Sequence, residues 1–308
     1  MTTHYNAQDN GFYLQCNATT IAVDLTQIPA NNSSCLIITH LKTETLSLLQ
    51  KELTIPIYLS QDLFWLLQKL ARFSFINLAK QEWKILPYGY FVELGDFKIQ
   101  ALKSDDGLFG ACSLLLIDKQ QHTIGYCGVF FNHGTHKKRI KAWKKVFAQS
   151  SLEHLILVKN KQIMPLSTEL SENNIQKSLL KFLNHTSKQE TSAIFSPWSP
   201  ERLLRYQKTA MGAGWQIIWQ KDFAQFLAAF YPFEEFLTTP SFPTKRLYQV
   251  AQPRFKQDTE VFIDPVITAF VNEPIELADL QASLVGLNDS ELKEFINYLK
   301  PKELHYCN

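Results

Sequence analysis

The sequence predicts an α/β protein in which stacked β-sheets are covered by helices, with a change of pattern after about residue 159. Two observations predict this class. Short apolar runs bounded by turn residues crowd the first 160 residues, with amphipathic helical segments between them, which favours a covered sheet sandwich over a simple doubly wound sheet. After residue 159 helical patterns dominate, and the chain ends in a strand, a helix and a strand.

The first half alternates strand and helix patterns. Cys35–His40 is an almost continuous apolar run, as expected for a strand that is buried on both faces. Thr43 suits the cap of the next helix, because its hydroxyl accepts backbone N–H bonds. The expected strands are Gly11–Cys16, Thr20–Asp24, Cys35–His40, Ile55–Leu59, Phe91–Leu94, Phe97–Leu102, Cys112–Ile117, His122–Cys127 and Leu155–Val158. Further helices are expected at Gln61–Arg72 and Lys137–Phe147.

The second half is predicted to be more helical. One helix has Ser199 as its cap, Pro200 in its first turn and Gly212 at its end. The expected helices are Ile175–Phe182, Pro200–Met211, Phe223–Phe230 and Asp289–Leu299, and the expected strands are Trp215–Trp219, Val261–Ile263 and Glu303–Tyr306. The segment Pro232–Lys256 is rich in proline and is expected to be mostly loop.

Composition excludes several classes of protein. An apolar fraction of 45% with 22 Phe and 6 Trp excludes a disordered chain, and a formal net charge of +2 does not make nucleic-acid binding the default. The cysteines form no CxxC pair, so neither a zinc knuckle nor a disulfide framework is indicated. We find no signal-peptide pattern and no apolar stretch of about 20 residues, so we expect a cytoplasmic protein without a membrane partner.

Several segments resemble the metallo-β-lactamase fold, in the order that the family has them. The family's second motif, an apolar strand that runs into a ligand loop, a helix and another strand, is similar to CLIITHLKTETLSLLQKELTIPIYL at Cys35–Leu59. The strand before it, which ends in a buried aspartate, is similar to Thr20–Asp24. The third and fourth motifs resemble Gly107–Ile117 and Thr123–Gly134. This resemblance implies a four-layer αββα sandwich.

Later segments resemble the β-CASP branch of the family, which includes RNA-processing nucleases such as ribonuclease J. The inserted domain of that branch is similar to Ala193–Phe230, and its closing segment is similar to Leu284–Asn308. The resemblance implies that residues 1–160 form the first part of a metallo-β-lactamase-like domain. Residues 161–265 would be a reduced β-CASP-like insertion, and residues 266–308 a return segment that completes the first domain.

Members of this family hold one or two zinc or manganese ions at the edge of the sheets, where the metal activates water. By resemblance, the first histidine is retained as His40, but the bridging carboxylate falls on Val129, whose isopropyl group cannot ligate a metal. An ammonium at Lys42 repels a divalent cation. The family's metal-site positions fall on Asp24, His40, Lys42, Glu44, Thr45, Asp106, Val129, Leu287 and Cys307. We therefore expect the usual two-metal site, and with it a cofactor, to be absent.

Two alternative metal sites stay open. The first would combine Asp24, His40, Glu44 and Asp106. Three carboxylates with one imidazole could hold a single Mn²⁺, Mg²⁺ or Zn²⁺ ion. In the second, a shift of register would offer His305 or the Cys307 thiolate as a ligand, because the two lie on one face of the last strand. The structural interpretation is favoured for each, with Asp24 accepting loop N–H bonds and His40 held by neighbouring backbone.

A basic cluster lies on the expected helix Lys137–Phe147. It comprises Lys137, Lys138, Arg139, Lys141, Lys144 and Lys145, with Trp143 among them. Such a cluster could contact a phosphate backbone while the tryptophan stacks on a base. The favoured interpretation is an amphipathic helix whose charged side faces water, with Ile140, Trp143 and Phe147 directed inward.

The resemblance and the altered metal positions together imply a non-catalytic relative of RNA-processing nucleases. Its partners would be RNA or an active nuclease subunit, and by resemblance also a second copy of itself. A first alternative is a metal-dependent hydrolase, a nuclease with a rebuilt one-metal site around His40, Glu44 and Asp106. A second alternative is a scaffold without a nucleic-acid role. The fold does not decide among the three, since function depends on the site.

Overall fold

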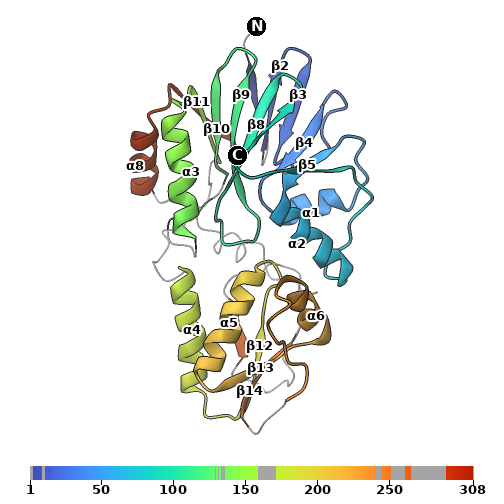
Figure 1. The fold of residues 1–308 in the computed structure, drawn as a ribbon, viewed down its shortest axis with the longest axis vertical. Helices are drawn as coiled ribbons and strands as arrows, with labels where there is room; N and C mark the ends of the chain where they lie inside the picture. The colour runs from blue at the N-terminus through green and yellow to red at the C-terminus, as the bar shows by residue number, and fades with distance from the viewer. Residues whose placement is uncertain are drawn as a thin grey trace. The chain divides into compact units, whose positions relative to one another are not determined.

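The computed structural model describes residues 3–8, 11–128, 130, 132, 136–158, 171–240, 244–250, 261–264 and 289–307 (Figure 1). The chain divides into two compact units. The first unit contains Met1–Leu66, Asn77–Pro165 and Val285–Asn308, and the second contains Leu67–Ile76 and Leu166–Leu284. The segment Leu67–Ile76 was expected in the first domain, and the return segment was expected to begin at residue 266, whereas the first unit resumes at Val285.

The first sheet of the first unit has six strands, and their order follows the chain. They are β1 (His4–Gln8), β2 (Gly11–Cys16), β3 (Thr19–Val23), β4 (Cys35–Ile38), β5 (Ile57–Ser60) and β6 (Trp83–Leu86). β1, β2 and β3 pair antiparallel, whereas β3 to β6 pair parallel. Parallel neighbours need crossover connections. Helix α1 (Thr43–Leu49) connects β4 to β5, and α2 (Gln61–Arg72) follows β5 directly.

The second sheet of the first unit also has six strands, in the order β16-β11-β10-β9-β8-β7. They are β7 (Phe91–Leu94), β8 (Phe97–Lys103), β9 (Cys112–Asp118), β10 (Thr123–Tyr126), β11 (His154–Val158) and β16 (Glu303–Cys307). β10, β11 and β16 are parallel. Helices α3 (Lys137–Gln149) and α8 (Asp289–Leu299) precede β11 and β16. The last strand of the chain therefore forms one edge of this sheet.

The two sheets face each other across an apolar core. The cluster between them includes Phe12, Leu14, Ile21, Ile99, Leu114 and Tyr126. On the outer face of the second sheet, Leu155 packs in a separate cluster with Trp143 of α3 and Phe295 of α8. Figure 1 draws α1 and the start of α2 beside β4 and β5. The first unit is thus a four-layer αββα sandwich, the layering that the sequence resemblance implied.

The second unit is built on a parallel four-stranded sheet in the order β13-β14-β12-β15. Its elements are α4 (Glu172–His185), β12 (Glu190–Ile194), α5 (Pro200–Gly212), β13 (Trp215–Ile218), α6 (Lys221–Phe230), β14 (Lys245–Gln249) and β15 (Val261–Ile263). The hydroxyl of Ser199 accepts the backbone N–H of Arg202, so the cap predicted there is confirmed. This unit is a small α/β unit, and its likeness to a β-CASP domain stays a prediction.

Several elements differ from the sequence-based expectation. The strands β1, β6, β12 and β14 were not predicted, and β14 lies inside the segment Pro232–Lys256 that was expected to be loop. β14 is held between β12 and β13, and this long-range pairing overrides the local proline content. Lys42, not Thr43, occupies the cap position of α1, and the Lys42 side chain makes no capping hydrogen bond. None of the described helices is long and apolar enough to cross a membrane.

Candidate functional site

Asp24 is the centre of a buried polar cluster at the carboxyl end of β3. It follows the strand in the left-handed backbone region, at a φ of 49°. Its carboxylate accepts hydrogen bonds from the backbone N–H and the hydroxyl of Thr39 at 2.7 and 2.5 Å, and from the hydroxyl of Tyr126 at 2.7 Å. Burial opposes ionisation, but the charge and hydrogen bond of His40, the charge of Lys42 and the hydrogen bond of Thr39 outweigh it and lower the pKa of Asp24 to about 2. An ionised carboxylate thus joins the ends of β3, β4 and β10.

His40 lies beside Asp24, two residues after β4, and its side chain is 4% exposed. Its Nδ1 atom lies 3.3 Å from the Asp24 carboxylate and 3.0 Å from the Thr39 hydroxyl oxygen. A Cβ atom on Gly128, which has a φ of +55°, would lie 3.3 Å from the same Nδ1 atom, so the backbone there packs against the ring. The other ring nitrogen, Nε2, is buried and has no hydrogen-bond partner among the described residues. A buried polar atom left in this state costs about 1–3 kcal/mol, which is typical of a position that receives a ligand or water.

The start of α1 brings a positive charge to this cluster. Lys42 is half-buried. Its positive charge favours the ionised forms of Asp24 and Cys307, whereas burial disfavours them. Glu44 follows in the first turn of α1 and is half-buried, and Thr45 is buried. An ammonium therefore stands where the family resemblance places the second histidine ligand.

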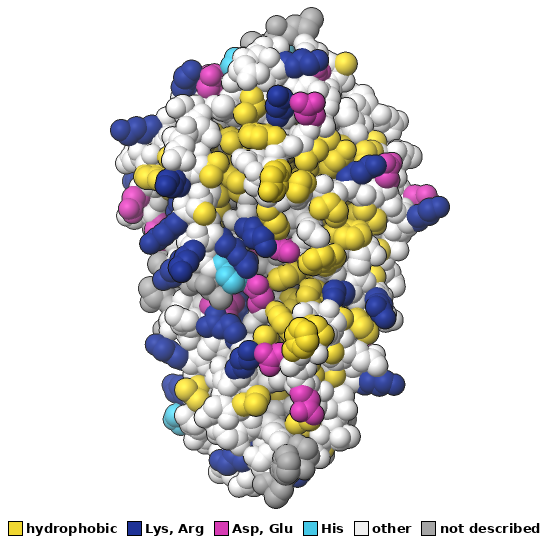
Figure 2. Space-filling model, viewed as in Figure 1, with side chains coloured by type: hydrophobic (Ala, Val, Ile, Leu, Met, Phe, Trp, Pro, Cys, Tyr) yellow, Lys and Arg dark blue, Asp and Glu magenta, His cyan; other side chains and the backbone are white. Residues whose placement is uncertain are grey.

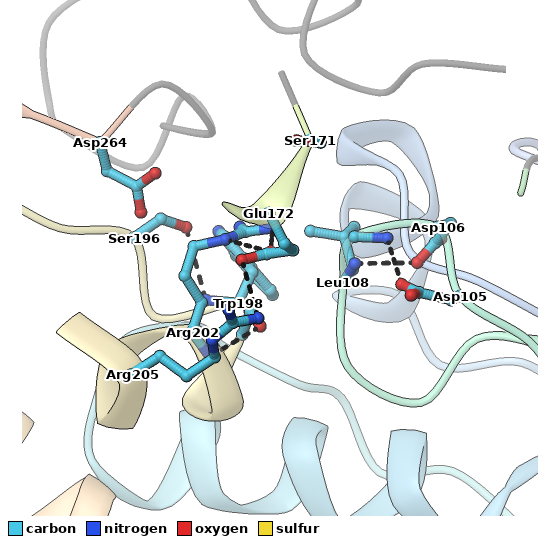
Figure 3. A network of polar contacts seen from close by, with 12 residues as sticks. Asp105, Asp106, Leu108, Ser171, Glu172, Ser196, Trp198, Arg202, Arg205 and Asp264 are labelled. Atoms are coloured by element: carbon cyan, nitrogen blue, oxygen red, sulfur yellow. Dashed lines mark hydrogen bonds and ion pairs between the residues drawn. The ribbon is translucent and has the colours of Figure 1, made fainter. Parts of the chain in front are cut away.

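Asp105 and Asp106 lie in the loop after β8, and both are buried (Figure 3). Asp106 accepts the backbone N–H of Leu108 at 2.9 Å, and Asp105 accepts the backbone N–H of His136 at 2.8 Å. Burial raises the pKa of Asp106 to about 6, although the charge of His40 acts in the opposite direction. Asp106 therefore changes its protonation state near neutral pH, whereas Asp24 stays ionised.

Replacement of Asp106 by asparagine is expected to stabilise the protein at pH 7 by about 2 kcal/mol. The pKa of Asp106 is about 6 in the folded state against an ordinary value of 3.8, so the ionised group opposes folding above pH 6. The wild type should gain stability as the pH falls from 6 to 4, because the folded state then binds the proton first. Urea unfolding at pH 7 and pH 5 checks this. A variant that is less stable than the wild type at both pH values would contradict it.

Cys307 is the last residue of β16 and the last of the family's metal-site positions in the chain. It is buried, and its thiol donates to the carbonyl oxygen of Leu157 at 3.5 Å. Burial raises the pKa of the thiol to about 12, although Lys42 acts in the opposite direction. Metal ions bind the thiolate, so a metal at this position would displace the thiol proton.

The described side chains at this edge do not form a group of three ligands. Among the described residues, Asp24, His40, Glu44, Asp106 and Cys307 do not bring three ligand atoms within 4.8 Å of one another. Both carboxylate oxygens of Asp24 already accept hydrogen bonds. Val129 and Leu287 lie outside the described residues. The described part of the chain does contain one such group, formed by His154, Glu303 and His305. It lies near the amino ends of β11 and β16, whereas Cys307 lies at the carboxyl end of β16.

Helix α3 directs its basic and apolar residues to opposite sides. Ile140, Trp143 and Phe147 are buried, as the amphipathic interpretation predicted. Trp143 is 1% exposed and packs against Phe130, so it cannot stack on a nucleic-acid base. Lys144 is half-buried and donates to the side-chain oxygen of Asn132 at 3.0 Å. Trp143 and Lys144 are therefore part of the folded core and its rim, not of a free surface.

The remaining basic side chains of α3 face solvent. Lys137, Lys138, Lys141 and Lys145 are exposed, and Arg139 is half-buried. Figure 2 shows basic side chains gathered on the left of the view, where Figure 1 draws α3. No acidic residue lies on α3, and none of the four exposed lysines makes an ion pair with a described residue.

The second unit holds a buried ion pair that the sequence did not reveal (Figure 3). Arg202 of α5 is 4% exposed, and its Nε atom donates to the Glu172 carboxylate of α4 at 2.6 Å. Burial disfavours the charged guanidinium, but the carboxylate beside it holds the pKa of Arg202 above its ordinary value. No spacing rule links residues 30 positions apart, so only the packing of α4 on α5 could show this pair.

Among the solved structures that resemble this chain, one crystal structure matches it over nearly its whole length. A crystal structure of a protein of unknown function from Enterococcus faecalis V583 matches with a TM-score of 0.66 and 13% identity. The match covers 98% of this chain and 84% of that chain. At this identity the likeness shows a shared fold and no more. No family model matches the chain, and no curated protein matches it significantly.

Other solved structures match with lower scores. The metallo-β-lactamase fold protein YhfI from Bacillus subtilis matches with a TM-score of 0.32 and 18% identity, over 49% of this chain and 62% of that chain. A possible metal-dependent hydrolase from Veillonella parvula DSM 2008 matches with a TM-score of 0.36 and 12% identity, over 69% of this chain and 93% of that chain. These two scores add no argument, and the αββα assignment depends on the sheets and helices of the first unit itself.

Proposed function

We propose that this chain is a non-catalytic relative of metallo-β-lactamase-fold RNA-processing nucleases, and that it binds RNA through the exposed lysines of α3. One observation carries the RNA-binding part of the proposal. Within nine residues α3 exposes four lysines, Lys137, Lys138, Lys141 and Lys145, without an acidic neighbour on the helix. Because the whole chain has a net charge of only +2, this local excess of positive charge is a specific feature.

The position of the basic residues on the helix strengthens this argument. Lys137, Lys138 and Arg139 occupy the first turn of α3, where the helix dipole already places positive charge. Each such residue disfavours the helix by about 0.3–1 kcal/mol. The Asp105 carboxylate accepts one N–H near this end and offsets part of that unfavourable energy. A local conflict of this kind is expected where a surface serves an anionic ligand.

The non-catalytic part of the proposal is supported by the edge near Asp24. Lys42 contributes an ammonium at the position where the resemblance places a ligand. Asp24 uses both oxygens to hold the ends of three strands together. One observation favours the alternative of a one-metal hydrolase, since the buried Nε2 atom of His40 has no partner among the described residues.

Alanine at Lys138 and Lys141 is expected to weaken RNA binding about tenfold near physiological salt. Loss of two phosphate contacts on single-stranded RNA should reduce the slope of log affinity against log salt by about 1.4. The matched control is Lys177→Ala/Lys181→Ala, which removes two exposed lysines from α4. Fluorescence anisotropy of a labelled single-stranded RNA, measured across a salt series, gives both quantities.

Equal losses in the two double variants would remove α3 as the RNA-binding surface. A wild-type protein without salt-sensitive binding would instead favour the scaffold interpretation. The same RNA, incubated with the protein and Mn²⁺ or Zn²⁺, should stay intact. Cleavage that disappears in His40→Gln would support the hydrolase alternative.

A further inference from the structure

His154, Glu303 and His305 come together at the amino ends of two neighbouring strands. β11 and β16 are parallel, and their register places His154 opposite Glu303 and Ile156 opposite His305. Because side chains alternate along a strand, the two histidines and the glutamate project from one face of the sheet. It is the face that carries Ile156 and Cys307 into the core between the sheets. Cys307 lies two residues beyond His305, about 7 Å further along β16, and is not a member of this group.

The three side-chain atoms form a nearly equilateral triangle. Nδ1 of His154 lies 3.0 Å from Nε2 of His305, and these two nitrogens lie 3.4 and 3.5 Å from the same carboxylate oxygen of Glu303. In a tetrahedral zinc site with bonds of about 2.0–2.1 Å, ligand atoms are about 3.3 Å apart. A point about 2.1 Å from all three atoms therefore exists just outside their plane.

Neighbouring groups hold the two imidazoles in place. The ring of Tyr5 packs against the His305 ring with centroids 4.9 Å apart. The ring of His122 meets the His154 ring edge to face at 6.5 Å, while its own Nδ1 atom lies 2.8 Å from the Asp118 carboxylate. The two ligand histidines are 27% and 24% exposed, and Glu303 is 63% exposed. The two histidine rings thus pack against neighbouring rings, while the Glu303 side chain is open to solvent.

We propose that His154, Glu303 and His305 bind one zinc ion, with the fourth coordination position open to water. Two imidazoles and one carboxylate are a ligand set that zinc accepts in this geometry. The ion joins the edge strand β16 to β11 and fixes the last strand of the chain. The competing interpretation is a hydrogen bond between the two imidazoles without a metal. This proposal is independent of the RNA-binding function proposed for α3.

Titration of chelator-treated full-length protein with Zn²⁺ tests the proposal. Isothermal titration calorimetry should show one ion bound per chain, and Co²⁺ in its place should give the visible absorption of a tetrahedral site. His305→Gln should weaken Zn²⁺ binding about 100-fold or more, since it removes one of three ligands. His185→Gln, which changes an exposed histidine at the end of α4, is the matched control and should bind like the wild type.

Thermal unfolding tests zinc binding even if His305→Gln is less stable than the wild type, because each protein is compared with and without zinc. Zn²⁺ should raise the Tm of the wild type and of His185→Gln, and it should leave the Tm of His305→Gln unchanged. Absence of stoichiometric binding to the wild type would overturn the proposal. Binding that His40→Gln abolishes and His305→Gln preserves would also overturn it, because the ion would then lie at the opposite edge of the sheets.

Discussion

Replacement of Glu172 by glutamine is expected to lower the free energy of unfolding by about 3–5 kcal/mol. The substitution keeps the size of the side chain but removes the larger of the two negative charges that compensate Arg202, the other being that of Asp264. The guanidinium is 4% exposed and Glu172 is 7% exposed, so water cannot replace the lost carboxylate. The nearest nitrogen of Arg205 is 3.9 Å from Glu172, and its own positive charge cannot compensate for the loss. Urea denaturation, with a check that the m-value is unchanged, measures the difference.

The second unit contains a matched control for this experiment. Glu190 pairs with Arg246 at 2.5 Å, but the two side chains are 52% and 27% exposed. Solvent screens such a pair, so Glu190→Gln is expected to cost less than about 1 kcal/mol. Replacement of both Glu172 and Arg202 by methionine should be milder than Glu172→Gln, because the buried guanidinium is removed together with the carboxylate that pairs with it. Equal effects of Glu172→Gln and Glu190→Gln would show that the α4–α5 pair is not isolated from water.

Replacement of Asp24 by asparagine is expected to lower the free energy of unfolding by about 3 kcal/mol at pH 7. The folded-state pKa of about 2 lies below the ordinary value of 3.8. A shift of this size corresponds to about 2.4 kcal/mol of stability. Because the folded pKa is lowered, this stability is present above about pH 4 and is lost as the pH falls through 2. The difference between wild type and variant should therefore shrink under acid conditions.

Unfolding curves at pH 7 and near pH 3 check the prediction for Asp24. Asp222→Asn is a suitable control, because Asp222 is an exposed acidic residue in the first turn of α6. That change should alter stability by less than about 1 kcal/mol. Asp24→Asn with wild-type stability at pH 7 would mean that the carboxylate does not hold the strand ends together. The opposite signs expected for Asp24 and Asp106 make the pair of aspartates a sensitive test of this edge.

Much of the fold could be predicted because local patterns and burial agree in many elements. α2 begins and ends as its apolar stripe predicted, at Gln61 and Arg72. The strands that were missed are short or carry polar residues, as in Glu190–Ile194 and Lys245–Gln249. Their strand conformation depends on pairing with residues far away in the chain, which periodicity within a few residues cannot show.

The candidate sites show the same division between local and long-range information. Asp24 and His40 could be singled out from the sequence because their segments resemble motifs of the metallo-β-lactamase fold. The pattern of alternating Glu303 and His305 is also visible in the sequence, since two residues on one strand face the same side. The partner His154 could not be found in this way, because it lies 151 positions before His305 and meets it only through the register of β11 and β16. The contacts of Trp143 with Phe130 and Phe295 could not be predicted from local patterns either.

The turn that leads into β16 decides which residues of the last strand face inward. Lys300 adopts a left-handed conformation at a φ of 48°, Pro301 follows, and the backbone N–H of Glu303 donates to the carbonyl of Glu153 at 2.8 Å. One residue added to or removed from this turn would rotate the whole strand by half a turn. Cys307 and His305 would then point outward together. The environments of His305 and Cys307 are therefore coupled, because any change in the length of the turn before β16 alters both of them together.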